Sequence, residues 1–345
     1  MRGIRTGFNV LLQFLAHTVV VIAHVRQRVP LKLAAGSTSL VELGLPTLAP
    51  SLSYAQPRPH IHAEVGRYRV RLAQSKEDRV AACRLRFRVF NIELGEGLES
   101  SYDTGLDTDR FDDVCEHLLV EDKSEDNPGR RIVGTYRMQS GETAKANLGY
   151  YSEQEFSFAA YEPLRPGILE LGRASIDREH RTPEVLTLLW RGIAQYANDM
   201  GLRYLIGCSS LTSRNPAEGW QLYRQLEHYR VSPEFETAPT AGYACPDEQE
   251  GAHPQPSPTA WARCSREART GGSVPAVAAE KSCNEDGPVP VSVPKLLKTY
   301  LAIGARIGGP PAWDREFGTI DFLTLLDLKL LSASARNRFL APLTQ

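Results

Sequence analysis

The chain has 345 residues, a hydrophobic fraction of 42%, a charged fraction of 23% and a formal net charge of −1. These values are ordinary for a soluble globular protein with one large domain or two small ones. The balanced charge argues against nucleic acid as the main partner, because nucleic-acid-binding domains are usually clearly basic. Six scattered cysteines form no C-x-x-C pair and no histidine stands at metal spacing, so we expect reduced thiols in a cytoplasmic protein and no metal site.

The first 62 residues are expected to form an extension outside the folded core. Arg2 and Arg5 precede a mainly apolar run at 8–25, which resembles a signal peptide or a weak membrane helix. Polar residues interrupt this run and a small-residue cleavage site is missing, so an interfacial helix or a poorly packed extension is the favoured interpretation. Residues 31–60 are rich in Ser, Pro and Gly and are interpreted as a linker. Peripheral contact with a membrane stays open.

The folded core is expected to begin with a strand, a helix and a hairpin. Residues 68–72 alternate between polar and apolar side chains, which predicts a strand with one solvated face. Ser75 starts a helix that runs to about residue 91, because a serine followed three residues later by an acid resembles a capping box. Residues 116–122 and 132–139 are two strands joined by a polar Asn-Pro-Gly turn, so they predict a hairpin.

A polar loop at 95–113 separates this helix from the hairpin and holds an acidic cluster. From charge alone, a solvated loop is the favoured interpretation. The helix before the loop carries Arg84, Arg86 and Arg88, of which two are expected to be solvated and one to face a site. The acidic residues of the loop are Glu99, Asp103, Asp107, Asp109, Asp112 and Asp113.

The centre of the chain, residues 168–211, predicts a strand, a helix and a second strand. The first strand, at 168–176, is mostly apolar but carries Glu170 and Arg173, and one of these charges must point inward if the strand is central. Thr182, followed by proline and glutamate, starts the helix, and a glycine ends it. The short apolar run that follows is the second strand. The unit has the size of a crossover between parallel strands.

Further elements complete the core. Residues 150–161 are predicted to be helical, with Phe156 and Phe158 as anchors. Residues 240–290 lack apolar periodicity and are interpreted as a flexible insertion. The other expected elements are a helix from Asn215 to about Tyr229, a strand at 231–237, a helix at 294–307 and a strand at 319–326.

These patterns divide the chain into four segments. They are an extension at 1–62, a core at 63–239, a low-complexity insertion at 240–293, and a helix and strand at 294–345 that complete the core.

The order of the elements resembles the GNAT acyltransferase fold, an α/β (α+β) fold with a mixed central sheet, splayed middle strands and flanking helices. Four motifs in order are similar to the signature of acyl-homoserine-lactone synthases and N-acyl amino acid synthases, although the acidic motif begins with Asp where the lactone synthases have Glu. The motifs are Arg86-x-Arg88-Val89-Phe90, Asp107-x-Asp109-x-Phe111-Asp112, Gly134-Thr135-Tyr136-Arg137 and Glu170-x-x-Arg173.

The C-terminal region carries the more specific resemblance, to the N-acyltransferases of ornithine lipid synthesis. The matching motifs are Leu296-Leu297-x-x-Tyr300-Leu301, Gly309-Pro310-Pro311, Asp314-Arg315-Glu316-Phe317 and Asp321-Phe322. Together the two resemblances cover roughly residues 68–237 and 294–340. They imply transfer of a long acyl or 3-hydroxyacyl chain from acyl carrier protein to the α-amino group of an amino acid, of which ornithine is the best-known acceptor.

Acylation of an amine requires a base, a held carbonyl, a stabilised oxyanion and a leaving thiol that is protonated. Glu170 is the candidate base, acting directly or through a water, or an anchor for the amine. The alternative is an ion pair between Glu170 and Arg173, but an i, i+3 spacing puts the two on opposite faces of a regular strand. A direct pair would therefore need a β-bulge, which the GNAT resemblance implies here.

Arg173 and Arg137 are expected on neighbouring strands, where either has the donors to hold the acceptor carboxylate bidentately. The alternative is a buried network in which these arginines order the acidic loop, and the two roles are compatible. With the resemblance, the aspartates of the loop become candidates for fixing the arginines or attracting a cationic acceptor. The candidate substrate-binding residues are Arg88, Asp107, Asp109, Asp112 and Arg137.

The acyl donor is expected to bind where the central helix begins. GNAT enzymes that use CoA usually hold its pyrophosphate on a glycine-rich arm, whereas residues 178–183 contain arginines and no glycine. Fewer bare N–H groups suit a single phosphate, so acyl carrier protein is favoured over acyl-CoA, and no resident cofactor is expected. The candidate phosphate-binding residues are Arg178, Arg181 and Thr182. The alternative is a plain helix cap with solvated arginines.

The residues and the resemblance together predict an N-acyltransferase that makes a lyso-ornithine-lipid precursor from acyl carrier protein and an amino acid. One rival is a synthase of acyl-homoserine lactones or of other N-acyl amino acids. A rival from another class is a non-catalytic acyl-carrier or lipid-binding protein that retains the fold.

Overall fold

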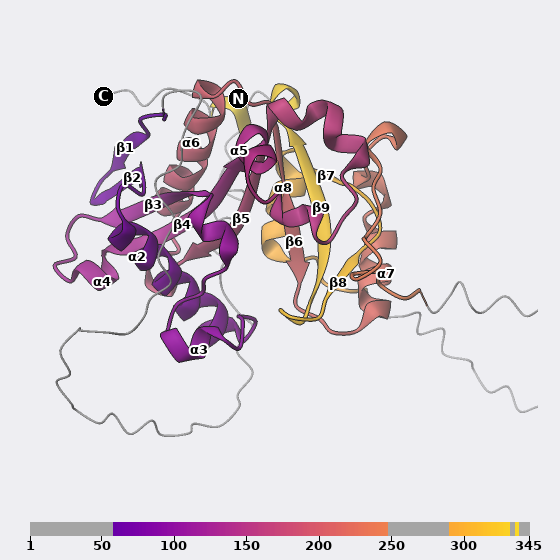
Figure 1. Ribbon diagram of the computed structural model, residues 1–345, viewed down its shortest axis with the longest axis horizontal. Helices are drawn as coiled ribbons and strands as arrows, with labels where there is room; N and C mark the ends of the chain where they lie inside the picture. The colour runs from indigo at the N-terminus through magenta and orange to yellow at the C-terminus, as the bar shows by residue number, and fades with distance from the viewer. Residues whose placement is uncertain (1–57, 248–289, 332–334, 338–345) are drawn as a thin grey trace, which may run out of the picture.

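The computed structural model describes residues 58–247, 290–331 and 335–337. Within these residues, nine strands form one mixed sheet with helices packed against it, as Figure 1 shows. The expected α/β fold, a mixed sheet flanked by helices, is confirmed. The predictions for residues 1–57 and for most of the insertion lie outside the described residues.

The first five strands are antiparallel neighbours in the order in which they occur in the chain. They are β1 (His62–Val65), β2 (Tyr68–Leu72), β3 (Glu116–Asp122), β4 (Ile132–Ser140) and β5 (Ile168–Ile176). The predicted strand at 68–72 and the predicted hairpin are confirmed. The hairpin turn contains α4 (Pro128–Arg131), whose first N–H groups are capped by the Asn127 side chain. Strand β1 was not predicted, because four residues are too short a run for alternation to be read.

Two helices cover opposite faces of this half of the sheet. Along β3, Leu119 packs with α2 (Lys76–Phe87), whereas its neighbours Leu118 and Val120 pack with α6 (Pro183–Asp199). The alternation follows from the two-residue period of a strand. Gly192 lets α6 approach closely, because a Cβ there would lie 2.8 Å from the Leu118 side chain.

Helix α2 starts where it was predicted to start. The Ser75 hydroxyl accepts a hydrogen bond from the N–H of Asp78 at 3.2 Å. Past Phe87 the helix continues as a π-helical segment, η1 (Arg88–Leu94), and ends at Gly95 with a left-handed backbone. Wide turns of this kind often occur next to functional sites.

The crossover unit at the centre of the chain is confirmed. Thr182 caps α6, and β6 (Tyr204–Leu211) runs parallel to β5. The two strands pair at three positions, of which the last joins Glu170 to Ile206. Beyond Glu170 the register ends although both strands continue, so the middle of the sheet is splayed, as the resemblance implied.

A β-bulge interrupts β5 at the same level. Thr135 pairs with Ser175, but Arg137, two residues further along β4, pairs with Gly172, three residues back along β5. The extra residue is accommodated at Arg173, whose φ of +51° is unusual for a residue other than glycine. Such a backbone costs about 1–3 kcal/mol and needs support from the surrounding structure.

The C-terminal segment completes the sheet. Strand β9 (Thr319–Asp327) pairs with β6 along its length, and the predicted strand at 319–326 is confirmed. Two short strands, β7 (Arg306–Ile307) and β8 (Ala312–Asp314), pair with β9. Helix α8 (Lys295–Ile303) is shorter than the predicted helix at 294–307, because Gly304 ends it with a φ of +112°.

Two predicted elements are wrong. Residues 150–161 do not form one helix but two 3-10 turns, η3 (Tyr151–Glu153) and the start of η4 (Ala159–Gly167). Phe156 and Phe158 are nevertheless buried anchors. Residues 231–237 do not form a strand, because Pro233 lacks a donor and starts the 3-10 turn Pro233–Phe235.

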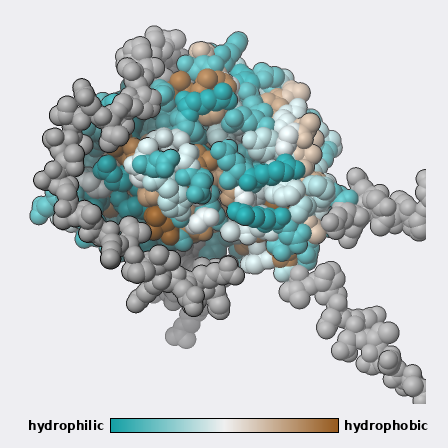
Figure 2. Space-filling view, turned by 60° about the horizontal axis from the view of Figure 1, so that its bottom comes forward, coloured by the Kyte–Doolittle hydropathy of each residue, from teal (hydrophilic) through white to brown (hydrophobic). Residues whose placement is uncertain are grey.

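The helix predicted from Asn215 to about Tyr229 is present in part. Helix α7 (Pro216–Gln225) is capped by the Asn215 side chain, and the chain then forms the 3-10 turn Glu227–Tyr229. Among the helices of the described residues, none combines the length and the apolar composition that a bilayer span requires. On the face shown in Figure 2, hydrophobic residues form small separate patches among hydrophilic ones.

Candidate active site

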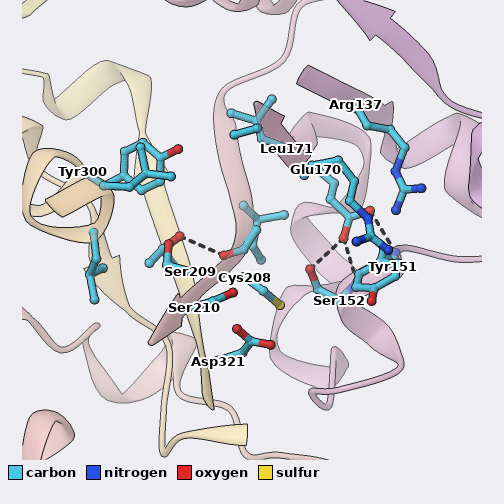
Figure 3. Close-up of a pocket in the computed structure, with 18 of the residues that line it drawn as sticks. Arg137, Tyr151, Ser152, Glu170, Leu171, Cys208, Ser209, Ser210, Tyr300 and Asp321 are labelled. Atoms are coloured by element: carbon cyan, nitrogen blue, oxygen red, sulfur yellow. Dashed lines mark hydrogen bonds between the residues drawn. The ribbon is translucent and has the colours of Figure 1, made fainter. Parts of the chain in front are cut away.

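A cavity of about 320 Å³ opens where β5 and β6 diverge. Figure 3 shows Tyr300 on one side of it and Glu170, Ser152 and Arg137 on the other. Its polar wall contains Arg137, Ser152, Glu155, Glu170, Arg173, Asp314 and Asp321. Its apolar wall contains Phe90, Leu171, Trp190, Leu205, Leu296, Tyr300 and Leu326. The cavity therefore suits a ligand with one charged end and one hydrocarbon end.

Glu170 stands at the point where the strands part and is 5% exposed. Its carboxylate accepts hydrogen bonds from the N–H of Tyr151 at 2.9 Å, the N–H of Ser152 at 2.8 Å and the hydroxyl of Ser152 at 2.7 Å. All three donors come from η3, the 3-10 turn that replaces the predicted helix. The turn therefore orients the carboxylate towards the cavity.

The electrostatics of Glu170 suit a residue that gains and loses a proton. Burial raises the pKa of Glu170 above the ordinary value, and the hydrogen bonds from Ser152 and Tyr151 oppose this rise. A carboxylate with a raised pKa is a stronger base than a solvated one, yet these three donors still favour its charged form. Glu170 can therefore accept a proton from an ammonium group that enters the cavity.

Within the described residues no ion pair joins Arg173 to Glu170. Its guanidinium nitrogens instead lie 3.1 Å from an Asp109 oxygen and 3.5 Å from an Asp107 oxygen. The group also lies 4.3 Å from the centroid of the Phe317 ring. The Arg173 side chain thus contacts the acidic loop and also lines the cavity.

Three aspartates of the acidic loop belong to a network of ion pairs, whereas Glu99 and Asp103 are exposed. Arg86 donates to Asp107 at 2.8 Å and to both oxygens of Asp112 at 2.7 Å, and Arg137 donates to Asp109 at 2.6 Å. The solvated-loop interpretation is wrong for these three aspartates, because the arginines compensate for the lost hydration of the carboxylates. Burial opposes ionisation of Asp112, yet Arg86 and Arg137 hold its pKa well below the ordinary range.

We call this set the arginine–aspartate network. Its members are Arg86, Arg137, Arg173, Asp107, Asp109 and Asp112. Three positive and three negative charges balance within it. It is the buried network that was expected as an alternative to carboxylate binding, and Arg137 and Arg173 also line the cavity.

The other predicted site residues lie outside the cavity wall. Arg88 pairs with Asp177 at 3.2 Å, and Arg181 holds both oxygens of Glu93. Thr182 caps α6, and the Arg178 side chain is exposed. The structure therefore gathers Glu170, Arg173, Arg137 and the three aspartates at one place, and sets the candidate phosphate-binding residues apart at the start of α6.

Several cavity residues were not recognised in the sequence. Ser152, which holds Glu170, was hidden because its segment was read as a helix. Glu155, Asp314 and Asp321 form a second acidic group in the wall. Asp321 carried a usable signal, since it is an acid inside the apolar strand β9, as Glu170 is in β5.

A splayed sheet with a buried carboxylate at the divergence defines an acyltransferase of the GNAT type. The family model of the acetyltransferase (GNAT) domain matches residues 85–191, which include this carboxylate. The chain is 31% identical over 278 residues to L-ornithine N(alpha)-acyltransferase of Brucella abortus strain 2308, a match that covers 79% of this chain and 89% of that protein. The chain belongs to the L-ornithine N(alpha)-acyltransferase family.

The chain is also similar to two further proteins. L-ornithine N(alpha)-acyltransferase of Agrobacterium fabrum strain C58 is 31% identical over 289 residues, covering 83% of this chain and 89% of that protein. The solved structure of a CoA-dependent acyl-homoserine lactone synthase, BjaI, is similar at 15% identity and a TM-score of 0.37, covering 77% of this chain and 84% of that one. The second likeness is too weak to carry a conclusion.

Proposed function

We propose that this enzyme transfers a long 3-hydroxyacyl or acyl chain from acyl carrier protein to the α-amino group of ornithine, giving a lyso-ornithine-lipid precursor. The acceptor follows from the names of the relatives, which are L-ornithine N(alpha)-acyltransferases. The single observation that carries the mechanism is Glu170, a buried carboxylate held at the mouth of the splayed strands.

The reaction divides between side chain and backbone. Glu170 takes a proton from the α-ammonium, and the freed nitrogen attacks the thioester carbonyl, so that a C–N bond forms and the C–S bond breaks. The second proton of the nitrogen passes to the departing thiolate. Past Glu170, β5 has no partner in β6, so its N–H groups on that side are free to meet the oxyanion of the tetrahedral intermediate.

The cavity walls support this arrangement of the two substrates. The hydrocarbon lining around Trp190 and Tyr300 suits an acyl chain, and its burial contributes about 0.8 kcal/mol per methylene. Arg173, whose charge lies at the polar wall, is placed to hold the acceptor carboxylate. The two substrates then meet at Glu170, between the apolar and the polar wall.

The choice of acyl carrier protein over CoA rests on the start of α6. The turn at Arg178–His180 has no glycine and places Asp177 and Glu179 beside the arginines, which disfavours a doubly charged pyrophosphate. The single phosphodiester of acyl carrier protein needs fewer hydrogen-bond donors than the pyrophosphate of CoA. Side-by-side assays with acyl carrier protein and CoA carrying the same chain test this choice, and a higher kcat/KM with CoA contradicts it.

The experiment that tests the function is an assay of the purified protein with 3-hydroxyacyl carrier protein and ornithine, read by mass spectrometry. We expect acyl-ornithine from the wild type and at least a hundredfold less from Glu170→Gln, at the lower end of the usual contribution of a general base, about 10²–10⁴-fold. Failure of the wild type to acylate any amino acid supports the rival in which the protein only binds acyl carriers or lipids.

A further inference from the structure

A second acidic group, separate from the arginine–aspartate network, lines the cavity. We call Glu155, Asp314 and Asp321 the acidic triad. They come from the segment after η3, from β8 and from β9, and one carboxylate oxygen of each lies within 4.8 Å of the others. Their exposed fractions are 1%, 3% and 4%. Three segments far apart in sequence thus bring three buried acids together.

The triad has no countercharge among the described residues. No ion pair there joins any of its members to an arginine or a lysine. One oxygen of Glu155 and one of Asp321 are buried and accept no hydrogen bond. A buried carboxylate without a partner is costly, and neighbouring carboxylates repel one another in addition. Two such oxygens at a cavity wall are therefore available to accept hydrogen bonds from a ligand.

The triad lies close to the proposed base. The Ser152 hydroxyl that donates to Glu170 is also within hydrogen-bonding reach of Cys208, and Cys208 is within reach of Glu155. Figure 3 shows Ser152 and Cys208 between Glu170 and Asp321. An extended ornithine holds its two nitrogens about 6 Å apart, so the two ends of one acceptor molecule are suited to contact two separate groups of the same cavity wall.

We infer that the acidic triad binds the side-chain ammonium of the acceptor amino acid and thereby selects a terminal amine three methylenes from Cα. The inference rests on the proposed function and goes further by naming the residues that choose the substrate. With the side-chain ammonium in the triad, the α-nitrogen is the one that reaches Glu170. The triad therefore decides both which amino acid is acylated and which of its nitrogens reacts.

The number of available ligand atoms favours an ammonium group over a metal ion. An ammonium donates three hydrogen bonds. The triad supplies one carboxylate oxygen from each of three side chains. A divalent ion of the hard kind needs about six oxygens at 2.0–2.6 Å, and one Asp314 oxygen is already bound by the N–H groups of Glu316 and Phe317.

The test compares ornithine with norvaline, which has the same carbon chain and no side-chain amine. For the wild type we expect a kcat/KM at least about 10³-fold higher with ornithine, because a site built for a charged donor rejects an analogue that lacks it. Asp321→Asn and Glu155→Gln should each lower kcat/KM for ornithine about 10- to 150-fold and change the value for norvaline less than about threefold. Calorimetric titration with ornithine gives a readout that does not depend on turnover.

A matched control removes a carboxylate beside the triad that does not face the cavity. Glu316 is exposed and is not among the residues that line the cavity. It contacts Asp314 through its backbone N–H. Glu316→Gln should leave the preference for ornithine unchanged. Circular dichroism of each variant shows whether the fold is intact.

Three outcomes contradict the inference, and a fourth contradicts the proposed function instead. Equal loss with ornithine and norvaline in folded Asp321→Asn makes the triad a structural element. Equal use of both amino acids by the wild type removes the selection. Loss of activity on EDTA treatment that Mg²⁺ or Ca²⁺ restores assigns the triad to a metal. Absence of transfer to either amino acid by the wild type contradicts the proposed function itself.

Discussion

Two groups of charged residues contribute to the cavity wall, and they differ in one respect. The arginine–aspartate network has three arginines for three aspartates, joined by hydrogen bonds of 2.6–2.8 Å at Arg86 and Arg137. The acidic triad has three carboxylates and, within the described residues, no cation. The triad is almost fully buried, whereas in the network Arg173 and Asp109 are partly exposed and the other four members are buried. The first group balances its charges internally and the second does not.

This difference in charge balance assigns the network to stabilising the fold and the triad to binding a cation. A balanced buried network loses much stability when one partner is removed, because a charge is left uncompensated. An unbalanced acidic group destabilises the ligand-free protein, and binding of a cation removes this destabilisation. We therefore expect substitutions in the two groups to have opposite effects on stability, while Glu170 between them governs turnover.

The largest expected effect belongs to Glu170. Glu170→Gln keeps the size of the side chain and removes the base, so kcat should fall about 10²–10⁴-fold. Burial raises the pKa of Glu170 above the ordinary 4.5, and the charged form is the active one, so kcat/KM should rise with pH to a midpoint above 4.5. Stopped assays over a pH series measure both. A wild-type midpoint at or below 4.5, or an unchanged pH profile in the variant, contradicts this role.

The next effect tests the balanced network. Asp112→Asn leaves the buried Arg86 and Arg137 short of a negative charge, and the free energy of unfolding should fall by about 3–5 kcal/mol. Urea denaturation followed by circular dichroism measures it. Asp103→Asn, an exposed carboxylate of the same loop, should stay within about 0.5 kcal/mol of the wild type. Similar small losses in both variants would mean that the network is not a support.

The opposite sign is expected in the triad. Burial and the neighbouring Asp314 raise the pKa of Asp321 from 3.8 to about 6, so the folded protein binds this proton more tightly than the unfolded chain does. The contribution of Asp321 to stability is thus present at low pH and is lost as the pH rises from about 4 to about 6. Without ornithine, Asp321→Asn should therefore be more stable than the wild type by up to about 3 kcal/mol at pH 7, and nearly equal to it at pH 4.

Measurements at two pH values test whether the higher stability of Asp321→Asn comes from relief of repulsion between the carboxylates. Thermal unfolding of the wild type and Asp321→Asn at pH 4 and pH 7, with and without ornithine, measures it. Saturating ornithine should stabilise the wild type more than the variant. Destabilisation by Asp321→Asn at both pH values would make the triad a support like the network.

The smallest effect provides a neutral reference at the apolar wall. The hydroxyls of Tyr136 and Tyr300 lie 2.7 Å apart in the core beside the cavity. Tyr300→Phe should lower the free energy of unfolding by about 1 kcal/mol, the usual net contribution of a neutral hydrogen bond. Urea denaturation checks the value. A loss as large as that of Asp112→Asn would erase the distinction between charged and neutral contacts.

The two charge groups were not equally visible in the sequence. The strands, the crossover and Glu170 follow from apolar period and from helix caps at Ser75 and Thr182, which are local signals. The contact of Arg137 and Arg173 with the aspartates was expected from motifs in order, two of which lie on the neighbouring strands β4 and β5. The solvated interpretation of its loop failed because the sequence does not reveal that Arg86 turns inward to Asp107 and Asp112.

The acidic triad was beyond local reasoning. Glu155 lies after a turn that was read as a helix, and Asp314 and Asp321 lie in the C-terminal segment, 159 and 166 residues further along the chain. Long-range pairing of β9 with β6 brings them to one wall. Pro233, which prevents a strand at 231–237, likewise shows that one missing donor outweighs an apolar pattern.

The most direct measurement is the position of the acyl group on the product. Tandem mass spectrometry of the material formed from 3-hydroxyacyl carrier protein and ornithine distinguishes acylation of the α-nitrogen from acylation of the side-chain nitrogen. We predict acylation of the α-nitrogen by the wild type and almost none by Glu170→Gln. Acylation of the side-chain nitrogen, or equal product from both proteins, would contradict the assignment of Glu170 as the base and the acidic triad as the site of the second amine.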